Sequence, residues 1–285
     1  MQSKNSLDIS VIVPFHNLAE LTLDCIKSLL KFGPSVKEIL LVSNNSNKPE
    51  LDKIRAFSVN HRNISILEYN KPFNYQVVNN WAVSKTSGSF ILFLNNDTEL
   101  REHSRGLLEY MYKKAAKPDV GIVGCLLLYG DERIIQHGGV YLVSGRLADH
   151  MYVGESYAEV LEQGGKVEKY PYDISKDLKM TAVTGAVSLV EKKKFLKVSG
   201  FDERFILCGG DVDLCIRLNK AGYQTWFASN NGQYILHKES QSRAFKPVPF
   251  NDFYYSYLSY KTAYDEKKLG DKYLPKICEL MEVAA

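Results

Sequence analysis

The first half of the chain alternates short apolar runs with amphipathic segments. The runs are rich in Ile, Leu and Val and are typical of strands buried on both faces of a parallel sheet. They span residues 9–13, 38–42, 64–69 and 90–94. Because parallel strands need crossover connections, this alternation predicts an α/β fold with right-handed crossovers.

The segments between these runs carry the apolar spacing of helices. Asn17 followed by Glu20 predicts a capping box that begins the first helix, and Gly33 marks its end. The same spacing predicts helices over residues 75–85 and 211–221.

The second half of the chain is less regular. Residues 120–128 and 182–190 are predicted strands, but residues 130–180 show no clear pattern. A connection of that length is longer than a passive loop usually is, so we expect part of it to be functional.

The chain has no internal repeat and no clear linker, and its last part is dense in aromatic residues. We therefore expect one domain over residues 1–247 and a C-terminal helical appendage over residues 248–285. Its aromatic residues could pack on the domain, form a homodimer face or, with nearby lysines, make peripheral contact with a membrane. They include Phe250, Phe253, Tyr254, Tyr257 and Tyr260.

Composition narrows the class of protein. The 285 residues are 45% hydrophobic and 24% charged, an ordinary globular balance. A net charge of +3 is too small to argue for nucleic acid as the main partner. Five cysteines without a C-x-x-C pair indicate a reducing compartment, and neither a signal peptide nor an apolar run of membrane-spanning length is evident. These features predict a cytoplasmic protein.

Small polar side chains follow three of the predicted strands. In open α/β sheets, ligands bind at the carboxyl ends of the strands. Asn and Ser can simply form turns, but three such turns are expected to meet at one sheet edge. The Gly-rich phosphate loops of Rossmann and P-loop proteins are absent. The residues are Pro14, Phe15, His16 and Asn17 after the first strand, Ser43, Asn44, Asn45 and Ser46 after the second, and Asn95 to Glu99 after the fourth.

The turn at Asn95, Asn96 and Asp97 offers oxygen ligands for a divalent cation. Mg²⁺ and Mn²⁺ take carboxylate and amide oxygens and complete their shells with phosphate oxygens and water. His237 is a candidate further ligand, and imidazole would favour Mn²⁺. The alternatives are that Asp97 caps a helix and that His237 is structural.

Asp211 and Asp213 stand at the start of a predicted helix. The helix dipole favours acids there and is enough to explain one of them. The preceding Gly209 and Gly210 would let the backbone approach a ligand closely. A carboxylate in that place could accept a proton from an attacking hydroxyl.

Seven short motifs in this order resemble the inverting family 2 glycosyltransferases of the GT-A fold. The resemblance is strongest to the bacterial branch that builds O-antigen, capsule and related surface glycans, and it runs from about Ile9 to Arg243. The motifs are ISVIVPFHN at 9–17, FNYQVVNN at 73–80, FLNNDTE at 93–99, IQHGG at 135–139, TGA at 184–186, FDERF with DVDLC at 201–205 and 211–215, and HKESQSR at 237–243.

The resemblance implies a role for each matching residue. Asp97 matches the second acid of the D-x-D element that holds the metal on the donor diphosphate, and His237 matches a later metal-contacting histidine. Asp211 matches the catalytic base, with Asp213 in support. The nucleotide-sugar and acceptor side would be bound by Pro14, Phe15, Asn17, Ser43, Asn45, Asn79, Asn95, Asn96, Thr184, Gly185 and Ala186.

The chain departs from the family pattern in two places. Ser43 stands where the family often has an Asp that contacts the base or ribose, and Asn95 stands at the first position of D-x-D. The resemblance implies Mn²⁺ or Mg²⁺, a UDP- or dTDP-sugar donor, and transfer to a hydroxyl of a polysaccharide, lipid-linked or glycoprotein acceptor. A non-catalytic GT-A-like subunit of a glycan assembly complex is the alternative. A nucleotidyltransferase is disfavoured because its Gly-rich loop is missing.

Overall fold

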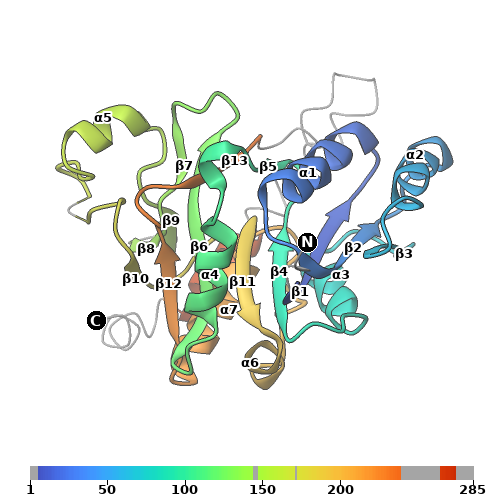
Figure 1. The fold of residues 1–285 in the computed structure, drawn as a ribbon. Coiled ribbons are helices and arrows are strands. Elements are labelled where there is room, and N and C mark those ends of the chain that lie inside the picture. The colour runs from blue at the N-terminus through green and yellow to red at the C-terminus, as the bar shows by residue number, and fades with distance from the viewer. Residues whose placement is uncertain (1–5, 144–146, 171, 239–263, 274–285) are drawn as a thin grey trace, which may run out of the picture.

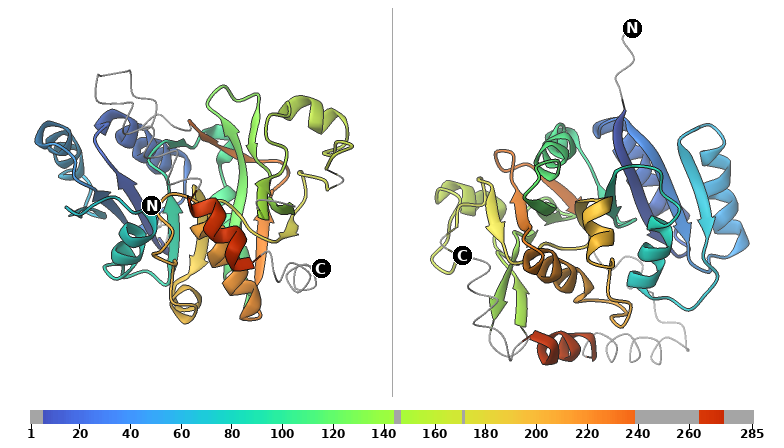
Figure 2. Two further views of the ribbon diagram at one scale, coloured as in Figure 1. Left: turned by 180° about the vertical axis from the view of Figure 1, so that it is seen from behind. Right: turned by 90° about the horizontal axis from the view of Figure 1, so that it is seen from below.

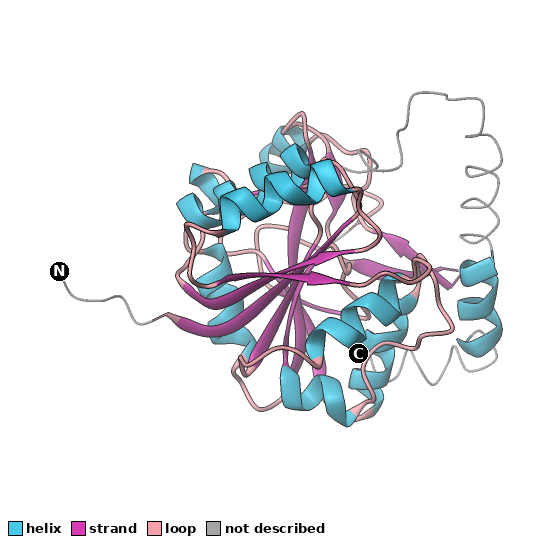
Figure 3. Cartoon of the chain, turned by 90° about the vertical axis from the view of Figure 1, so that its right-hand side faces the viewer, coloured by secondary structure: helices cyan, strands magenta, loops and turns pink. Residues whose placement is uncertain are grey.

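The computed structural model describes residues 6–143, 147–170, 172–238 and 264–273 (Figure 1). They form one large mixed sheet with helices on both faces, as Figure 3 shows. The predicted α/β fold is therefore confirmed. The strand order is β10 (Leu178–Met180), β12 (Gln224–Ala228), β6 (Val120–Tyr129), β11 (Val187–Glu191), β4 (Phe90–Leu94), β1 (Leu7–Phe15), β2 (Val36–Ser43) and β3 (Ile64–Glu68).

The N-terminal half is a parallel sheet. β3, β2, β1 and β4 run in the same direction, with Val13 opposite Leu41 and Ile12 opposite Phe93. Their carboxyl ends, and the turns that follow them, therefore share one edge. The connecting helices are α1 (Ala19–Phe32), α2 (Lys48–Ser58) and α3 (Tyr75–Val83).

Alternate residues of the buried strands enter two different cores because strand side chains alternate between faces. Val11 and Val13 join a cluster beneath α1, α2 and α4 (Leu107–Ala115). Ile12 joins the cluster on the other face, beneath α3, α6 (Lys192–Lys197) and α7 (Gly210–Lys220). Burial on both faces explains why these strands read as continuous apolar runs.

The predicted capping box at Asn17 and Glu20 is wrong. Leu18, in the left-handed region at φ 49°, is the N-cap residue, and no side chain of its own caps α1. The Glu50 carboxylate instead accepts a hydrogen bond of 2.6 Å from the Ala19 amide. Asn17 Oδ1 accepts from the backbone of Asn47, so this side chain joins the turns that follow β1 and β2.

The predicted strand over residues 182–190 is shorter in the structure. Only Val187–Glu191 forms β11, which runs antiparallel to both β4 and β6. Before it, the Thr184 hydroxyl accepts a hydrogen bond of 3.2 Å from the Ala186 amide. Such a local bond closes a turn, which delays the start of the strand to Val187.

Residues 130–180, which the sequence pattern left unassigned, contain a group of short elements. They are β7 (Ile135–His137), β8 (Val140–Val143), β9 (Leu147–His150), α5 (Tyr157–Glu162) and β10. β7 pairs with one side of β6. On the other side of β6, β13 (Tyr234–His237) pairs with β6 and with the two-residue β5 (Thr98–Glu99). A single 3₁₀ turn at Glu102–Ser104 follows β5.

A helical segment at residues 264–273 packs beside α7, as the red helix in Figure 2 shows. Its Leu269 and Tyr273 are 4% exposed and belong to the same apolar cluster as α7. The aromatic residues named above between 250 and 260 lie outside the described residues. Within the described ranges, no helix is both long and apolar enough to cross a membrane.

Phe93 on β4 is a test of the core beneath α6. Its ring is buried with centroids 5.5 Å from Phe195 and 5.0 Å from Phe201. We expect Phe93→Ala to lower the free energy of unfolding by about 3–5 kcal/mol, because it leaves a cavity in this aromatic cluster. Urea denaturation measures the loss. The matched control Phe73→Ala, at a ring 43% exposed, should change it by less than about 1 kcal/mol, and equal losses would contradict this packing.

Candidate active site

The turn after β4 lies next to the end of β13. β5 and β13 pair antiparallel, with His237 directly opposite Thr98. This pairing brings His237 Nε2 to 3.0 Å from Asp97 Oδ1. Both residues are only 6% exposed, so the carboxylate and the imidazole meet in a nearly buried place.

The hydrogen bonds around His237 show what this pair can hold. Its Nδ1 lies 2.9 Å from Gln136 Oε1, an acceptor, so Nδ1 carries the proton. Nε2 then presents a lone pair, which also faces the side-chain nitrogen Nδ2 of Asn95 at 3.4 Å. Asp97 Oδ1 is buried and has no hydrogen-bond donor among the residues that the structure describes. Two lone pairs facing each other need a proton or a cation, so these residues fit a divalent metal ion.

The protein side of such a metal site would be small. Among the described residues, no group of three or more His, Cys, Asp or Glu side chains is placed to hold a metal ion. Asp97 and His237 would supply two ligands, and the remaining positions would fall to ligand oxygens and water. That division is usual for Mg²⁺ and Mn²⁺ bound with phosphates.

Residues of α1 contact the turn that contains Asn95 and Asp97. The Cys25 thiol lies 3.4 Å from Thr98 Oγ1 and 3.6 Å from the Asn95 carbonyl oxygen. Burial raises the pKa of Cys25 to about 12, and the Asp97 charge contributes, so the thiol stays neutral. Asn96 donates to the Thr22 hydroxyl of α1 at 3.1 Å and therefore faces the helix, while Asn95 faces His237.

Asp211 lies in the first turn of α7, directly after Gly209 and Gly210. Gly209 has φ 74°, which disfavours side chains, and a Cβ on Gly210 would lie 2.4 Å from the Gln76 side chain. Asp211 Oδ2 accepts a hydrogen bond of 2.8 Å from the Gly185 amide. The carboxylate is partly exposed and keeps lone pairs free to accept a further proton.

The turn at Thr184, Gly185 and Ala186 joins the two acidic groups. The Ala186 carbonyl accepts from the backbone N–H of Asn95 at 2.9 Å, and the Gly185 carbonyl accepts from the Tyr75 hydroxyl at 2.9 Å. Burial raises the pKa of Tyr75, and the nearby charges of Asp211 and, more weakly, Asp97 raise it further. The backbone of this turn therefore connects the strand end that precedes Asp97 with the Asp211 carboxylate.

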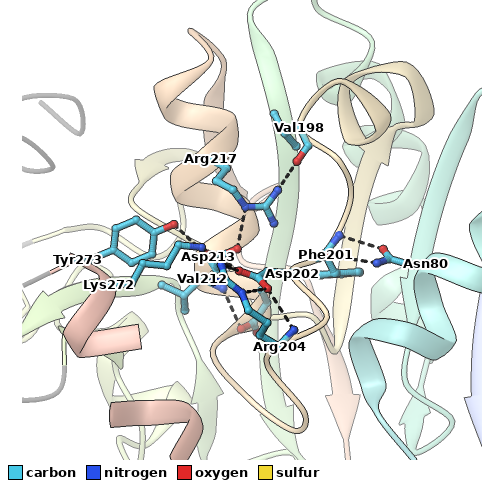
Figure 4. A network of polar contacts seen from close by, with 11 residues as sticks. Asn80, Val198, Phe201, Asp202, Arg204, Val212, Asp213, Arg217, Lys272 and Tyr273 are labelled. Atoms are coloured by element: carbon cyan, nitrogen blue, oxygen red, sulfur yellow. Dashed lines mark hydrogen bonds and ion pairs between the residues drawn. The ribbon is translucent and has the colours of Figure 1, made fainter. Parts of the chain in front are cut away.

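Asp213 does not share this arrangement. It is fully buried, and its oxygens accept hydrogen bonds from Arg217 at 2.7 Å, Lys272 at 2.5 Å and Tyr273 at 2.6 Å (Figure 4). Two residues along a helix correspond to roughly 200° of rotation, so Asp211 and Asp213 point to different sides. The structure thus places Asp213 in a structural network rather than beside Asp211.

The residues predicted to bind the nucleoside divide into two groups. Phe15, Ser43 and Asn79 are buried at 3%, 1% and 0% exposure, and Asn79 donates to the Tyr75 carbonyl within α3. Pro14 is partly exposed at the end of β1.

The polar turns after β1 and β2 are more open. The backbone N–H of Asn17 donates to Ser46 Oγ at 2.9 Å. The side chain of the exposed Asn45 donates through Nδ2 to the Lys71 carbonyl at 2.7 Å. The exposed His16, which was not among the predicted binding residues, lies with Nδ1 2.8 Å from the Asn44 carbonyl. These groups are the ones that a nucleoside could reach at this edge.

Sequence reasoning also missed Gln136, His137 and Tyr75 as parts of the site. His137 Nε2 accepts from the Thr184 amide at 3.4 Å. Burial holds the pKa of His137 well below its usual range, and the nearby His150 and His237 lower it further. All three residues lie in motifs noted above, at 73–80 and 135–139, but only their contacts reveal which side chains orient the site.

Two family models match this chain. Residues 10–142 match the model described as glycosyl transferase family 2, and residues 165–240 match the model described as the N-terminal domain of galactosyltransferase. The Myxococcus xanthus protein named O-antigen biosynthesis protein RfbC is 35% identical over 266 residues. That alignment covers 93% of this chain but only 20% of the relative, so the chain spans about a fifth of that protein.

Glycosyltransferases are among the solved structures that share this fold. The mannosyltransferase PcManGT of Pyrobaculum calidifontis, in complex with GDP-Man and Mn²⁺, has a TM-score of 0.59 at 14% identity, covering 85% of this chain and 59% of its own. GalNAc-T7 with UDP, GalNAc and Mn²⁺ has a TM-score of 0.62 at 14% identity, covering 82% and 44%. At such low identity the likeness shows the fold, which is the GT-A fold.

Gln136 offers a test of the metal site through a residue that would not touch the metal. We expect Gln136→Leu to weaken Mn²⁺ binding in the presence of UDP about ten- to a hundred-fold, because the imidazole of His237 loses the acceptor that orients it. Calorimetric titration measures the affinity. Gln163→Leu, at an exposed position after α5, is the matched control. An unchanged Mn²⁺ affinity in Gln136→Leu would contradict this role.

Proposed function

We propose that this chain, which belongs to glycosyl transferase family 2, transfers a sugar from a nucleotide-sugar donor to a hydroxyl in a metal-dependent reaction. The observation that carries the proposal is the convergence of Asp97, His237 and Asp211 around the turn at Gly185. The buried pair Asp97 and His237, whose facing lone pairs suit a cation, and the partly exposed carboxylate of Asp211 then lie at one sheet edge. That is the edge where α/β sheets bind their ligands.

The proposed donor site lies at the ends of β1, β2 and β4. Asp97 and His237 would hold Mn²⁺ or Mg²⁺, which when bound neutralises charge on the diphosphate leaving group. The two solved neighbours hold Mn²⁺ with GDP-Man or with UDP and GalNAc, which supports a nucleotide diphosphate in this place. A UDP- or dTDP-sugar remains the donor we propose on the sequence resemblance.

The proposed reaction is a single displacement at the anomeric carbon with inversion. Asp211 would accept the proton of the acceptor hydroxyl as that oxygen bonds to the anomeric carbon and the sugar–phosphate bond breaks. The Gly185 amide donates to Oδ2 of Asp211 at 2.8 Å and the Val212 amide donates to Oδ1 at 2.9 Å, so the carboxyl group is kept in one orientation. Such preorganisation is what a general base requires.

The acceptor we propose is a growing surface glycan, either a polysaccharide, a lipid-linked glycan or a glycoprotein. The support is the likeness to a protein named for O-antigen biosynthesis. A peripheral membrane contact or a homodimer would rest on aromatic residues outside the described ranges. Co-sedimentation with anionic liposomes tests the first, and sedimentation velocity tests the second.

A non-catalytic nucleotide- or glycan-binding subunit is the second candidate. Ser43 in place of the usual Asp favours it, since a hydroxyl that is 1% exposed reads a base less firmly than a carboxylate. If the purified protein slowly hydrolyses a sugar nucleotide and this hydrolysis depends on Mn²⁺, the protein is an enzyme and not a binding subunit.

Asp211 is the direct test of catalysis. We expect Asp211→Asn to lower the rate of sugar transfer about 10²–10⁴-fold, because the amide cannot take the acceptor proton. Donor binding, followed by thermal shift with Mn²⁺, should be kept. Asp24→Asn, at an exposed acid of α1, removes the same charge and should leave the rate unchanged. A normal rate in Asp211→Asn would remove this residue from the base role.

Asp97 tests the metal. We expect Asp97→Asn to abolish the part of donor binding that depends on Mn²⁺, since the neutral amide is a weaker ligand facing His237. Thermal shift with UDP-, dTDP- and GDP-sugars, with and without EDTA, measures it. Donor affinity that is indifferent to both EDTA and the substitution would overturn the metal site while leaving Asp211 untested by this assay.

A further inference from the structure

The helical segment at residues 264–273 contacts the loop that leads into α7. Leu269 and Tyr273 bury their side chains in the apolar cluster that α7 shares. Lys268 Nζ donates to the Arg204 carbonyl, and Lys272 Nζ donates to Asp202 Oδ2 at 3.0 Å. This segment, far from α7 in sequence, is therefore attached to the loop by polar as well as apolar contacts (Figure 4).

Asp265 makes the most specific of these contacts. Its Oδ2 accepts hydrogen bonds from three successive backbone amides, Ile206 at 2.9 Å, Leu207 at 2.7 Å and Cys208 at 3.3 Å. Successive amides that point to one place form an anion-binding concavity. Here the anion is a carboxylate of the protein itself, and it is fully buried. Oδ1 is buried without a partner in the described ranges, so these three bonds are what offset the burial of this carboxyl group there.

The loop held in this way ends at Asp211. On its other side, the Ile206 carbonyl accepts from the Tyr75 amide at 2.9 Å, at the start of α3. Only Gly209 and Gly210 separate the three amides from Asp211, and glycine by itself fixes the backbone poorly. The position of Asp211 relative to Gly185 therefore depends on how firmly residues 206–208 are held.

The same segment fixes α7 just beyond Asp211. Lys272 and Tyr273 both donate to Oδ1 of the buried Asp213, at 2.5 and 2.6 Å. Asp211 is thus flanked in sequence by two attachments, one at residues 206–208 and one at Asp213. Both attachments come from residues 264–273, which neither family model covers.

We propose that Asp265 is a positioning residue for the proposed reaction, and that residues 264–273 act as a clamp that holds Asp211 in place for proton transfer. The inference rests on the proposed function, because it assigns the clamp a role in the same site. Asp265 acts through the loop and does not touch the reacting atoms.

The experiment compares Asp265→Asn with Asp271→Asn in the full chain. Asp271 is an exposed acid of the same segment, so the control removes the same charge without touching the loop. Hydrogen exchange is measured first and needs no substrate. We expect the amides of residues 206–208 to exchange more than about ten-fold faster in Asp265→Asn alone, because each loses a bond to a charged acceptor.

Activity is measured second, as Mn²⁺-dependent hydrolysis of UDP-glucose, dTDP-rhamnose and GDP-mannose. We expect Asp265→Asn to lower kcat about ten- to a hundred-fold with KM for the donor unchanged, since misplacement of Asp211 leaves the donor site intact. Lys268→Met removes the bond to the Arg204 carbonyl and the contacts of the ammonium group with the Phe205 and Tyr264 rings. It is a milder variant should Asp265→Asn not fold, and it should show smaller changes in the same direction.

Two outcomes overturn the proposal. Exchange at residues 206–208 that stays unchanged means that Asp265 does not hold the loop. Faster exchange with a normal kcat means that holding the loop does not position Asp211. A wild-type protein that hydrolyses none of the three donors counts against the proposed function, whereas the exchange measurement still decides whether the clamp exists.

Discussion

The site depends on the close approach of Asp97 and His237 across the β5–β13 pair. Bringing a carboxylate and an imidazole together with little exposure is costly unless something compensates both lone pairs. Gln136 fixes the orientation of His237, and Cys25 supports the turn at Asn95 from below. The surrounding structure therefore holds in place a carboxylate and an imidazole whose facing lone pairs repel each other unless a proton or a cation lies between them.

From this pair, a short series of hydrogen bonds leads across the sheet edge to Asp211. The turn at Gly185 is the connection, since its neighbour Ala186 accepts from Asn95 and its own amide donates to Asp211. This turn occupies residues 184–186, so β11 begins only at Val187. A continuous strand there would have satisfied the Gly185 amide within the sheet and left the Asp211 carboxylate without its donor.

The two acids at the start of α7 show how tertiary contacts separate residues that look alike in sequence. Both satisfy the helix dipole. Asp211 faces the Gly185 turn, whereas Asp213 is fully buried among Arg217, Lys272 and Tyr273. Burial of the second acid is tolerated because three donors surround it, and the result is that the segment carrying Lys272 is joined to the proposed catalytic helix.

The sequence by itself determined the parallel half of the fold, because strands buried on both faces must be continuous apolar runs, and β4 begins and ends where that pattern predicts. It also selected Asp97, His237 and Asp211 as candidates, because their motifs stand at predicted strand and helix ends. Tertiary structure alone decided that Asn17 joins two turns, that Asp213 is buried against Tyr273 and that Asp265 accepts hydrogen bonds from the loop before Asp211. Those roles are set by partners distant in the chain, and no local spacing encodes them.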